Sequence, residues 1–162
     1  MTCKNKSLEP FLTAVFLIFL ISCGQNNSSN ILTQKENKIA DDQKLNIDTF
    51  STFPPEIDGC SCYFSNDSTA FKKAEYIYVD DYAQISFLKI NGVLTKFTRT
   101  AFQEVGSLNG IAIYKADKYI MTIESKDGMQ NGDETWLKTG TIKLTDNNGT
   151  TITKTFYGEC GC

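Results

Sequence analysis

The residues best suited to chemistry in this sequence are four cysteines, arranged as two Cys-x-Cys pairs. Cys60 and Cys62 belong to the segment GCSCYF, and Cys160 and Cys162 to the segment GECGC. Thiols in such pairs either oxidise to disulfides or, as thiolates, bind a soft metal such as zinc or copper(I). The arrangement therefore predicts two disulfides or, as the alternative, one four-sulfur metal site.

The phase of the two pairs favours disulfides. Residues two apart on an extended strand point to the same face of the sheet, and Cys160 and Cys162 share the phase of the apolar Phe156. The first pair likewise shares the phase of an aromatic neighbour, so we expect both pairs to point toward a core. Antiparallel first and last strands would join Cys60 to Cys162 and Cys62 to Cys160. Parallel strands would join Cys60 to Cys160 and Cys62 to Cys162, and a bridge within either pair would be strained.

The sequence contains no histidine, which removes most other catalytic chemistry. Histidine is the usual general base near neutral pH and a common ligand of catalytic zinc. Serine–histidine, cysteine–histidine and HExxH sites are therefore excluded. The absence predicts a protein that is not an enzyme and that carries no cofactor.

The remaining candidates for a chemical site are acidic residues. Asp80 and Asp81 are adjacent, and the run Asp127–Glu134 (DGMQNGDE) combines acids with glycine. Such loops can supply oxygen ligands to calcium, and converging carboxylates could serve an enzyme. The run lacks the EF-hand spacing, and acids in loops between strands are usually just solvated, so no metal site is predicted there.

Aromatic side chains are the candidate binding residues. The only tryptophan, Trp136, stands beside the acidic run, and Tyr76 and Tyr78 are two residues apart on one predicted strand. Tyr157 has the phase opposite to the expected core face of the last strand. Such side chains are typical of recognition surfaces; alternatively, they pack beneath loops or cover the end of a barrel.

The elements that must position these groups are short β-type runs separated by turn signals. Asn91-Gly92 between two such runs is a strong hairpin signal, and Asp146–Gly149 (DNNG) predicts another tight turn. The one credible helix covers 69–75, capped by Asp67-Ser68. We therefore predict an all-β domain, an antiparallel β-barrel or sandwich of about seven or eight short strands, with at most one short helix. The predicted strands are 75–79, 83–90, 93–102, 111–114, 119–124, 136–145 and 150–156.

The first residues have the pattern of an export signal. Lys4 and Lys6 precede the apolar run FLTAVFLIFLI, which is shorter than the roughly 20 residues that a membrane-spanning helix needs. The following Leu20-Ile21-Ser22-Cys23 resembles the lipobox of bacterial lipoproteins, with a small residue before the obligatory cysteine. The resemblance covers residues 1–23. It implies cleavage before Cys23 and lipidation of its thiol.

This resemblance also implies a compartment. The lipid holds the chain to a membrane, and Gly24 in place of an aspartate favours the outer membrane of the envelope, with the domain facing the periplasm. An exported chain meets oxidising conditions. Of six cysteines, Cys3 leaves with the signal peptide and Cys23 is acylated, which leaves four to pair as disulfides.

The domain organisation follows from composition. Residues 1–22 are the predicted signal peptide, and 23–55 the lipidated cysteine with a polar, flexible tether that ends at Pro54-Pro55. Residues 56–162 are the predicted disulfide-stapled β domain. As an alternative, Leu45–Phe53 pairs with the domain as an extra edge strand.

Charge and organisation together indicate a class of function. With 16 basic and 19 acidic residues, the chain has no basic footprint for nucleic acid. We expect a membrane-anchored lipoprotein whose β domain is a binding module for an envelope protein or glycan. An inhibitor-like role is one version, since lysozyme inhibitors include small, disulfide-bearing, lipidated β-barrels, a likeness of architecture alone. The alternative is a metal-binding protein that uses Cys60, Cys62, Cys160 and Cys162.

Overall fold

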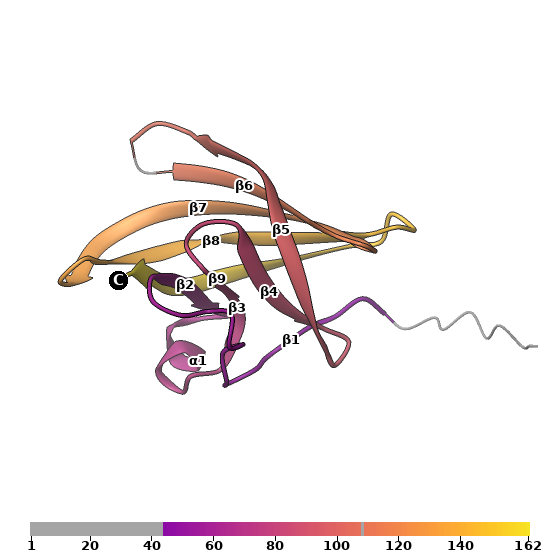
Figure 1. Cartoon of the computed structure of the whole chain (residues 1–162), viewed down its shortest axis with the longest axis horizontal. Helices are drawn as coiled ribbons and strands as arrows, with labels where there is room; N and C mark the ends of the chain where they lie inside the picture. Colours follow the sequence, from indigo (N-terminus) through magenta and orange to yellow (C-terminus); the bar gives the residue numbers. More distant parts are fainter. Residues whose placement is uncertain (1–43, 108) are drawn as a thin grey trace, which may run out of the picture. The chain divides into compact units, whose positions relative to one another are not determined.

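The computed structural model describes residues 44–107 and 109–162; the predicted signal peptide, Cys23 and residues 24–43 of the predicted tether lie outside this part. The described residues form a closed barrel of eight antiparallel strands, β2 to β9, with one extra strand, β1, and one helix, α1 (Figure 1). Each barrel strand pairs with its neighbours in sequence, and β9 returns to pair with β2. The elements are β1 (Ile47–Asp48), β2 (Ser61–Ser65), α1 (Ser68–Lys72), β3 (Tyr76–Asp80), β4 (Ile85–Ile90), β5 (Val93–Glu104), β6 (Asn109–Ala116), β7 (Tyr119–Gly132), β8 (Thr135–Asp146) and β9 (Thr151–Gly161).

The predicted fold class is confirmed, and of its two forms the barrel is the one observed. Several strands are longer than predicted: β7 has 14 residues and β8 has 12. Most of the extra length of β7 comes from the acidic run Asp127–Glu134. Most of this run continues β7 through two irregularities in its pairing with β8, so it is not the loop that its composition suggested.

Local chemistry explains the turns and the helix start. Asn91 and Gly92 have φ values of 46° and 83°, the left-handed conformation that a two-residue hairpin turn requires. The Asp146 carboxylate accepts hydrogen bonds from two amides of the next turn, at 2.9 and 2.8 Å. Asp67 caps α1 as predicted, by accepting from two backbone amides. The helix ends at Lys72, three residues before the predicted end.

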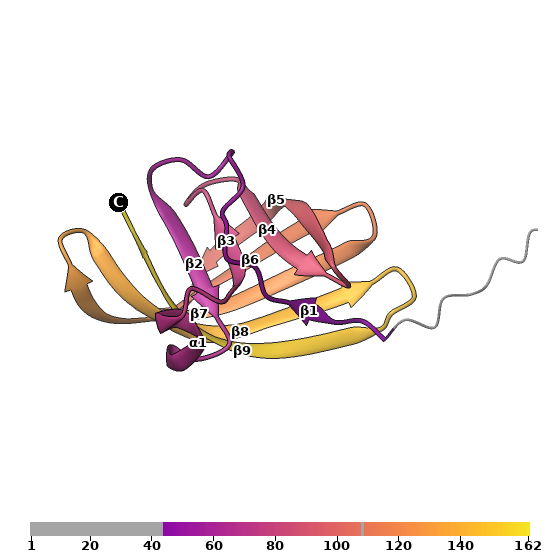
Figure 2. The ribbon, with the colours of Figure 1, turned by 90° about the horizontal axis from the view of Figure 1, so that it is seen from below.

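An apolar core fills the end of the barrel at which the β4–β5, β6–β7 and β8–β9 turns lie, here called the closed end. Its central side chains are at most 1% exposed: Ile90, Phe97, Met121, Ile142 and Leu144. Leu45 and Ile47 join the same cluster, at 6% and 4% exposed. β1 lies along the end of β4, with Ile47 opposite Ile90 (Figure 2). The alternative of an extra edge strand therefore describes residues 47–48, and the folded part begins before the predicted boundary at residue 55.

A bulge in β3 decides which tyrosines face the interior. Phe64 pairs with Tyr78, yet the next residue of β2, Ser65, pairs with Tyr76, so Ile77 is an extra residue. One extra residue reverses the alternation of faces. Tyr76 and Tyr78 therefore lie on opposite sides of the sheet, although their spacing predicted a shared face.

No helix among the described residues has the length and apolar content to cross a membrane.

Candidate ligand-binding site

The end of the barrel opposite the closed end opens into a cavity of about 470 Å³. β4 pairs with β5 only as far as Ile85 opposite Thr98, whereas the pairing of β5 with β6 continues to Glu104. The inner wall of β5 to β8 therefore extends beyond β4 and stays accessible. We call this cavity the mouth; its lining includes Cys62, Asp80, Arg99, Tyr114, Lys138 and Cys160.

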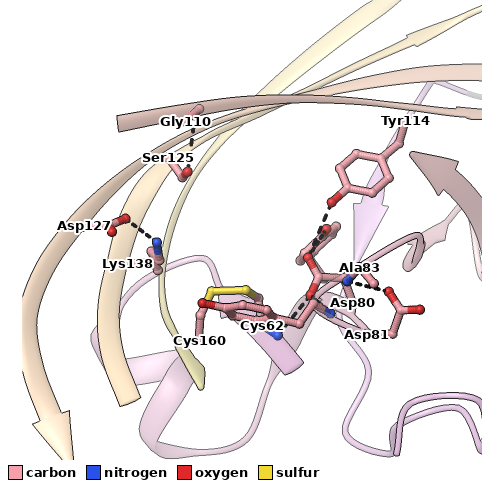
Figure 3. Close-up of a disulfide and its surroundings, with 12 residues drawn as sticks. Cys62, Asp80, Asp81, Ala83, Gly110, Tyr114, Ser125, Asp127, Lys138 and Cys160 are labelled. Carbon is pink, nitrogen blue, oxygen red and sulfur yellow. Dashed lines mark hydrogen bonds and ion pairs between the residues drawn. A yellow bond between two sulfur atoms is a disulfide. The ribbon is translucent and has the colours of Figure 1, made fainter. Parts of the chain in front are cut away.

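A buried disulfide forms part of the mouth. Cys62 on β2 is bonded to Cys160 on β9, and the two residues are 9% and 2% exposed (Figure 3). Cys60 is bonded to Cys162, so the pairing is the one expected for antiparallel first and last strands. Only the inner pair is core-directed, because Cys60 precedes β2 and Cys162 follows β9, where strand alternation no longer applies. Sulfur in these two bridges offers no thiolate to a metal.

The carboxyl group of Asp80 is the most buried charge-bearing group of the mouth, at 8% exposed. Its Oδ1 accepts hydrogen bonds from the backbone amides of Cys62 and Tyr82, at 3.0 and 2.8 Å. Its Oδ2 accepts from the hydroxyls of Tyr78 at 2.7 Å and of Tyr114 at 3.5 Å (Figure 3). Burial raises the pKa of Asp80, although the bonds from Tyr78, Tyr82 and Cys62 act in the opposite direction. All four contacts are donors, so both carboxyl oxygens are already occupied.

The two tyrosines are fixed as hydrogen-bond donors by their surroundings. Burial, together with the charge of Asp80, raises the pKa of Tyr78 well above its ordinary value. The same two causes raise the pKa of Tyr114 to about 12, although the nearby Arg99 guanidinium acts to lower it. Both hydroxyls therefore keep their protons at neutral pH. The Tyr114 hydroxyl donates to Asp80, and Tyr114 is the direct partner of Arg99 across β6 and β5.

The other wall of the mouth carries an ion pair. Lys138 on β8 donates to the Asp127 carboxylate on β7, and these residues are direct partners across the two strands (Figure 3). Nearby, the Ser125 hydroxyl donates to the carbonyl of Gly110 at 3.4 Å. The first acid of the run 127–134 therefore belongs to the mouth wall. Among residues 44–107 and 109–162, no three potential metal-binding side chains gather at one point.

Asp80 and Asp81 do not converge on one site. Asp81 turns to the loop before β4, where its Oδ1 accepts from three successive amides, those of residues 83, 84 and 85. Its partial burial acts to raise the pKa, but these amides prevail, and the pKa of Asp81 is lowered. Asp81 therefore organises a turn, while Asp80 organises the barrel interior.

The predicted binding aromatics lie in three places. Tyr78 is inside the barrel, with its ring 6.2 Å from that of Tyr114 between centroids. Tyr76 and Tyr157 lie outside it, where both rings pack against Phe71 of α1. The two tyrosines therefore pack against a helix, whereas the alternative stated above placed the aromatics beneath loops or over the end of the barrel. Trp136 is 38% exposed and stands opposite Cys160, close to the mouth but outside its lining.

Sequence reasoning missed Arg99, Phe102 and Tyr114. An irregularity between Arg99 and Ala101 in the pairing of β5 with β6 inserts Thr100, so that Arg99 and Phe102 both face inward. Strict alternation would have placed them on opposite faces. Tyr114 faces the mouth together with Ala112, but the more apolar Ile111 and Ile113 have the other phase, so the pattern of this strand pointed to the wrong face.

A second hollow, of about 970 Å³, lies at the closed end. Hairpin-turn residues such as Asp117, Lys118 and Asn147 line it, and their side chains are exposed. It contains no buried charged group, whereas the mouth combines a buried carboxyl group, two tyrosine hydroxyls, an arginine and an apolar wall. The mouth is therefore the candidate site.

Scans against protein-family models and searches of curated proteins and of solved structures found no match for this chain.

Proposed function

We propose that this chain is a cell-envelope lipoprotein whose β-barrel is a non-enzymatic binding module, with its ligand seated in the mouth. The observation that supports this most is the cavity of about 470 Å³ at one end of the barrel. Pockets for small molecules usually measure about 300 to 1,000 Å³ and combine an apolar lining with a few polar groups. An eight-stranded barrel is just wide enough to hold one small ligand. The expected partner is an envelope protein or glycan. The proposal adds that the partner, or one end of it, is small enough to enter the mouth.

Binding is favoured over catalysis by how the polar groups of the mouth are used. The sequence has no histidine, both oxygens of Asp80 accept hydrogen bonds from the protein, and Asp127 is paired with Lys138. A general base needs a proton acceptor, and a general acid a proton donor, within hydrogen-bond reach of the substrate, and the two carboxylates already accept hydrogen bonds within the protein. The groups of the mouth are arranged to hold shape and to orient a ligand.

The membrane anchor is supported by the lipobox-like motif at Cys23. The exported chain would carry its lipid there and hold the barrel in the periplasm, with the outer membrane favoured. A Cys23→Ser variant is expected to leave the membrane fraction and to lose incorporation of labelled fatty acid. Retention of the variant in the membrane fraction would contradict the anchor and leave the binding proposal untouched.

The binding proposal is tested with a neutral apolar probe, N-phenyl-1-naphthylamine, whose fluorescence rises in apolar surroundings. The protein is the exported chain from Gly24 without lipid, which contains every described residue. Saturable binding is expected. An Ala112→Phe variant, which fills the mouth, should weaken it at least about tenfold, a difference of about 1.4 kcal/mol.

The control is Ile111→Phe, which adds a similar ring on the outer face of the same strand, β6. Ile111 pairs with Gln103 and Glu124 and is absent from the lining of the mouth. This variant should bind the probe like the parent chain, with circular dichroism confirming that both variants are folded. Absence of binding to the parent chain, or equal loss in both variants, would overturn the proposal.

A further inference from the structure

The Arg99 guanidinium is the one basic group of the mouth without an acidic partner among the described residues. It lies 5.5 Å from the centre of the Phe102 ring, and Arg99 is the direct partner of Tyr114 across β5 and β6. Its backbone amide donates to the carbonyl of Gln84 at 2.8 Å, which fixes β5 at the point where its pairing with β4 ends. The backbone of Arg99 is therefore fixed and its guanidinium lies against the Phe102 ring, while it makes no salt bridge with any described residue.

Three of the other four charged groups that line the mouth, Asp80, Asp127 and Lys138, are bonded within the protein. Lys138 is paired with Asp127, and the four hydrogen bonds to Asp80 come from two amides and two tyrosines. The fourth, Glu104, is solvent-exposed at the end of β5. Inside the mouth, a cationic ligand would have to displace existing donors from Asp80 or Asp127. An anionic ligand would find the N–H donors of Arg99 without a carboxylate among the described residues.

From this arrangement we infer that the ligand of the mouth is an amphipathic anion, whose acid group pairs with Arg99 and whose apolar body contacts Phe102, Ala112 and Ile123. The inference rests on the proposed function and names its ligand class. A planar guanidinium suits the two oxygens of a carboxylate, sulfonate or phosphate. The Tyr114 hydroxyl donates its proton to Asp80, which leaves the guanidinium as the donor for the acid group. Phe102, although 55% exposed, faces inward beside Arg99 because of the Thr100 bulge and offers the apolar surface next to the charge.

The experiment compares two probes with the same aromatic body. One is the neutral N-phenyl-1-naphthylamine, and the other is 8-anilino-1-naphthalenesulfonate, which adds one sulfonate. The chain from Gly24 should bind the sulfonate at least about tenfold more tightly, because the sulfonate oxygens accept charge-assisted hydrogen bonds from the guanidinium. An Arg99→Gln variant should lose this preference and keep the affinity for the neutral probe.

The matched control is Lys126→Gln, which removes one positive charge from the outer face of β7 near the mouth. Lys126 is exposed and outside the lining, so this variant should keep the full preference for the sulfonate. A parent chain that binds both probes equally would overturn the inference and leave the proposed function standing, and so would an equal effect of the two variants. A parent chain that binds neither probe would overturn both.

Discussion

The two ends of the barrel are built from the same strands but carry different interiors. On β8, Ile142 and Leu144 face the apolar core of the closed end and are fully buried, whereas Lys138, four residues before Ile142, faces the mouth in an ion pair. The closed end is covered by Leu45 and Ile47. The hollow at the closed end is lined by exposed turn residues, whereas the cavity of the mouth is lined by a buried carboxyl group and a buried disulfide. The charged side chains of the interior, Asp80, Arg99 and Lys138, are thus gathered at one end, and this is the basis for proposing that end as the binding site.

The disulfides give the largest expected effect, because both lie on the mouth side of β2 and β9. They close nested loops, with sequence separations of 102 and 98. Replacing all four cysteines by alanine should lower the free energy of unfolding by about 4 to 5 kcal/mol, as expected for a loop of this length. Replacing Cys60 and Cys162 alone should cost far less, because the inner bridge still closes almost the same loop. Urea unfolding measures both values.

Two results would contradict this prediction about the disulfides. Equal destabilisation by the outer pair alone and by all four replacements would show that the inner bridge contributes nothing. The mass of the unreduced chain provides a second check, since two bridges remove four hydrogens. Free thiols together with bound zinc would instead support the alternative metal site.

The second contrast separates packing from binding. Leu144→Ala at the closed end should lower the free energy of unfolding by about 2 to 5 kcal/mol, as large-to-small changes in a core do. The affinity of the folded variant for the sulfonate probe should stay within about twofold of the parent's. Arg99→Gln should have the reverse pattern, with a small change in stability and loss of the sulfonate preference. Calorimetry measures the stability of both variants, and probe titration measures their affinities. A folded Leu144→Ala variant that loses probe binding would contradict the separation of packing at the closed end from binding at the mouth.

The smallest expected effect is a pH dependence of stability that comes from the mouth. The pKa of Asp80 is raised above its ordinary 3.8 in the folded chain, so between those two values the folded state binds more protons than the unfolded state. This contribution to stability therefore increases as pH falls through the folded pKa toward 3.8. Relative to Asp80→Asn, the parent chain should gain stability on acidification. Denaturation of both proteins at a series of pH values measures the difference between their free energies of unfolding. The opposite contribution of Asp81 is present in both proteins and cancels in this difference. Parallel pH profiles would show that Asp80 is not desolvated.

Features set by local chemistry could be predicted from the sequence. The Asn91-Gly92 turn, the Asp67 cap and the inward phase of Cys62 and Cys160 each depend on residues close together in the chain. The antiparallel alternative for the first and last strands then correctly gave the disulfide partners. The acidic run 127–134 was misjudged because its composition is that of a loop, while its pairing with β8 is set by the whole barrel.

The site itself was mostly beyond sequence reasoning. Asp80 and Tyr78 were candidates, but their contact with Tyr114 joins β3 to β6, two strands that are not neighbours in the barrel. Arg99 and Phe102 face the same side only because of the bulge at Thr100. Bulges depend on pairing between strands and leave no local signature in a single sequence. The bulge at Ile77 caused the corresponding error for Tyr76.

The claim that the mouth is the binding site is tested most directly by mapping amide chemical shifts of the isotope-labelled chain during titration with 8-anilino-1-naphthalenesulfonate. The largest changes should occur at Arg99, Tyr114 and Ser125, around the mouth. The turn residues of the closed end, such as Lys118 and Asn147, should change little. Changes concentrated at the closed end, with the mouth unaffected, would contradict the claim.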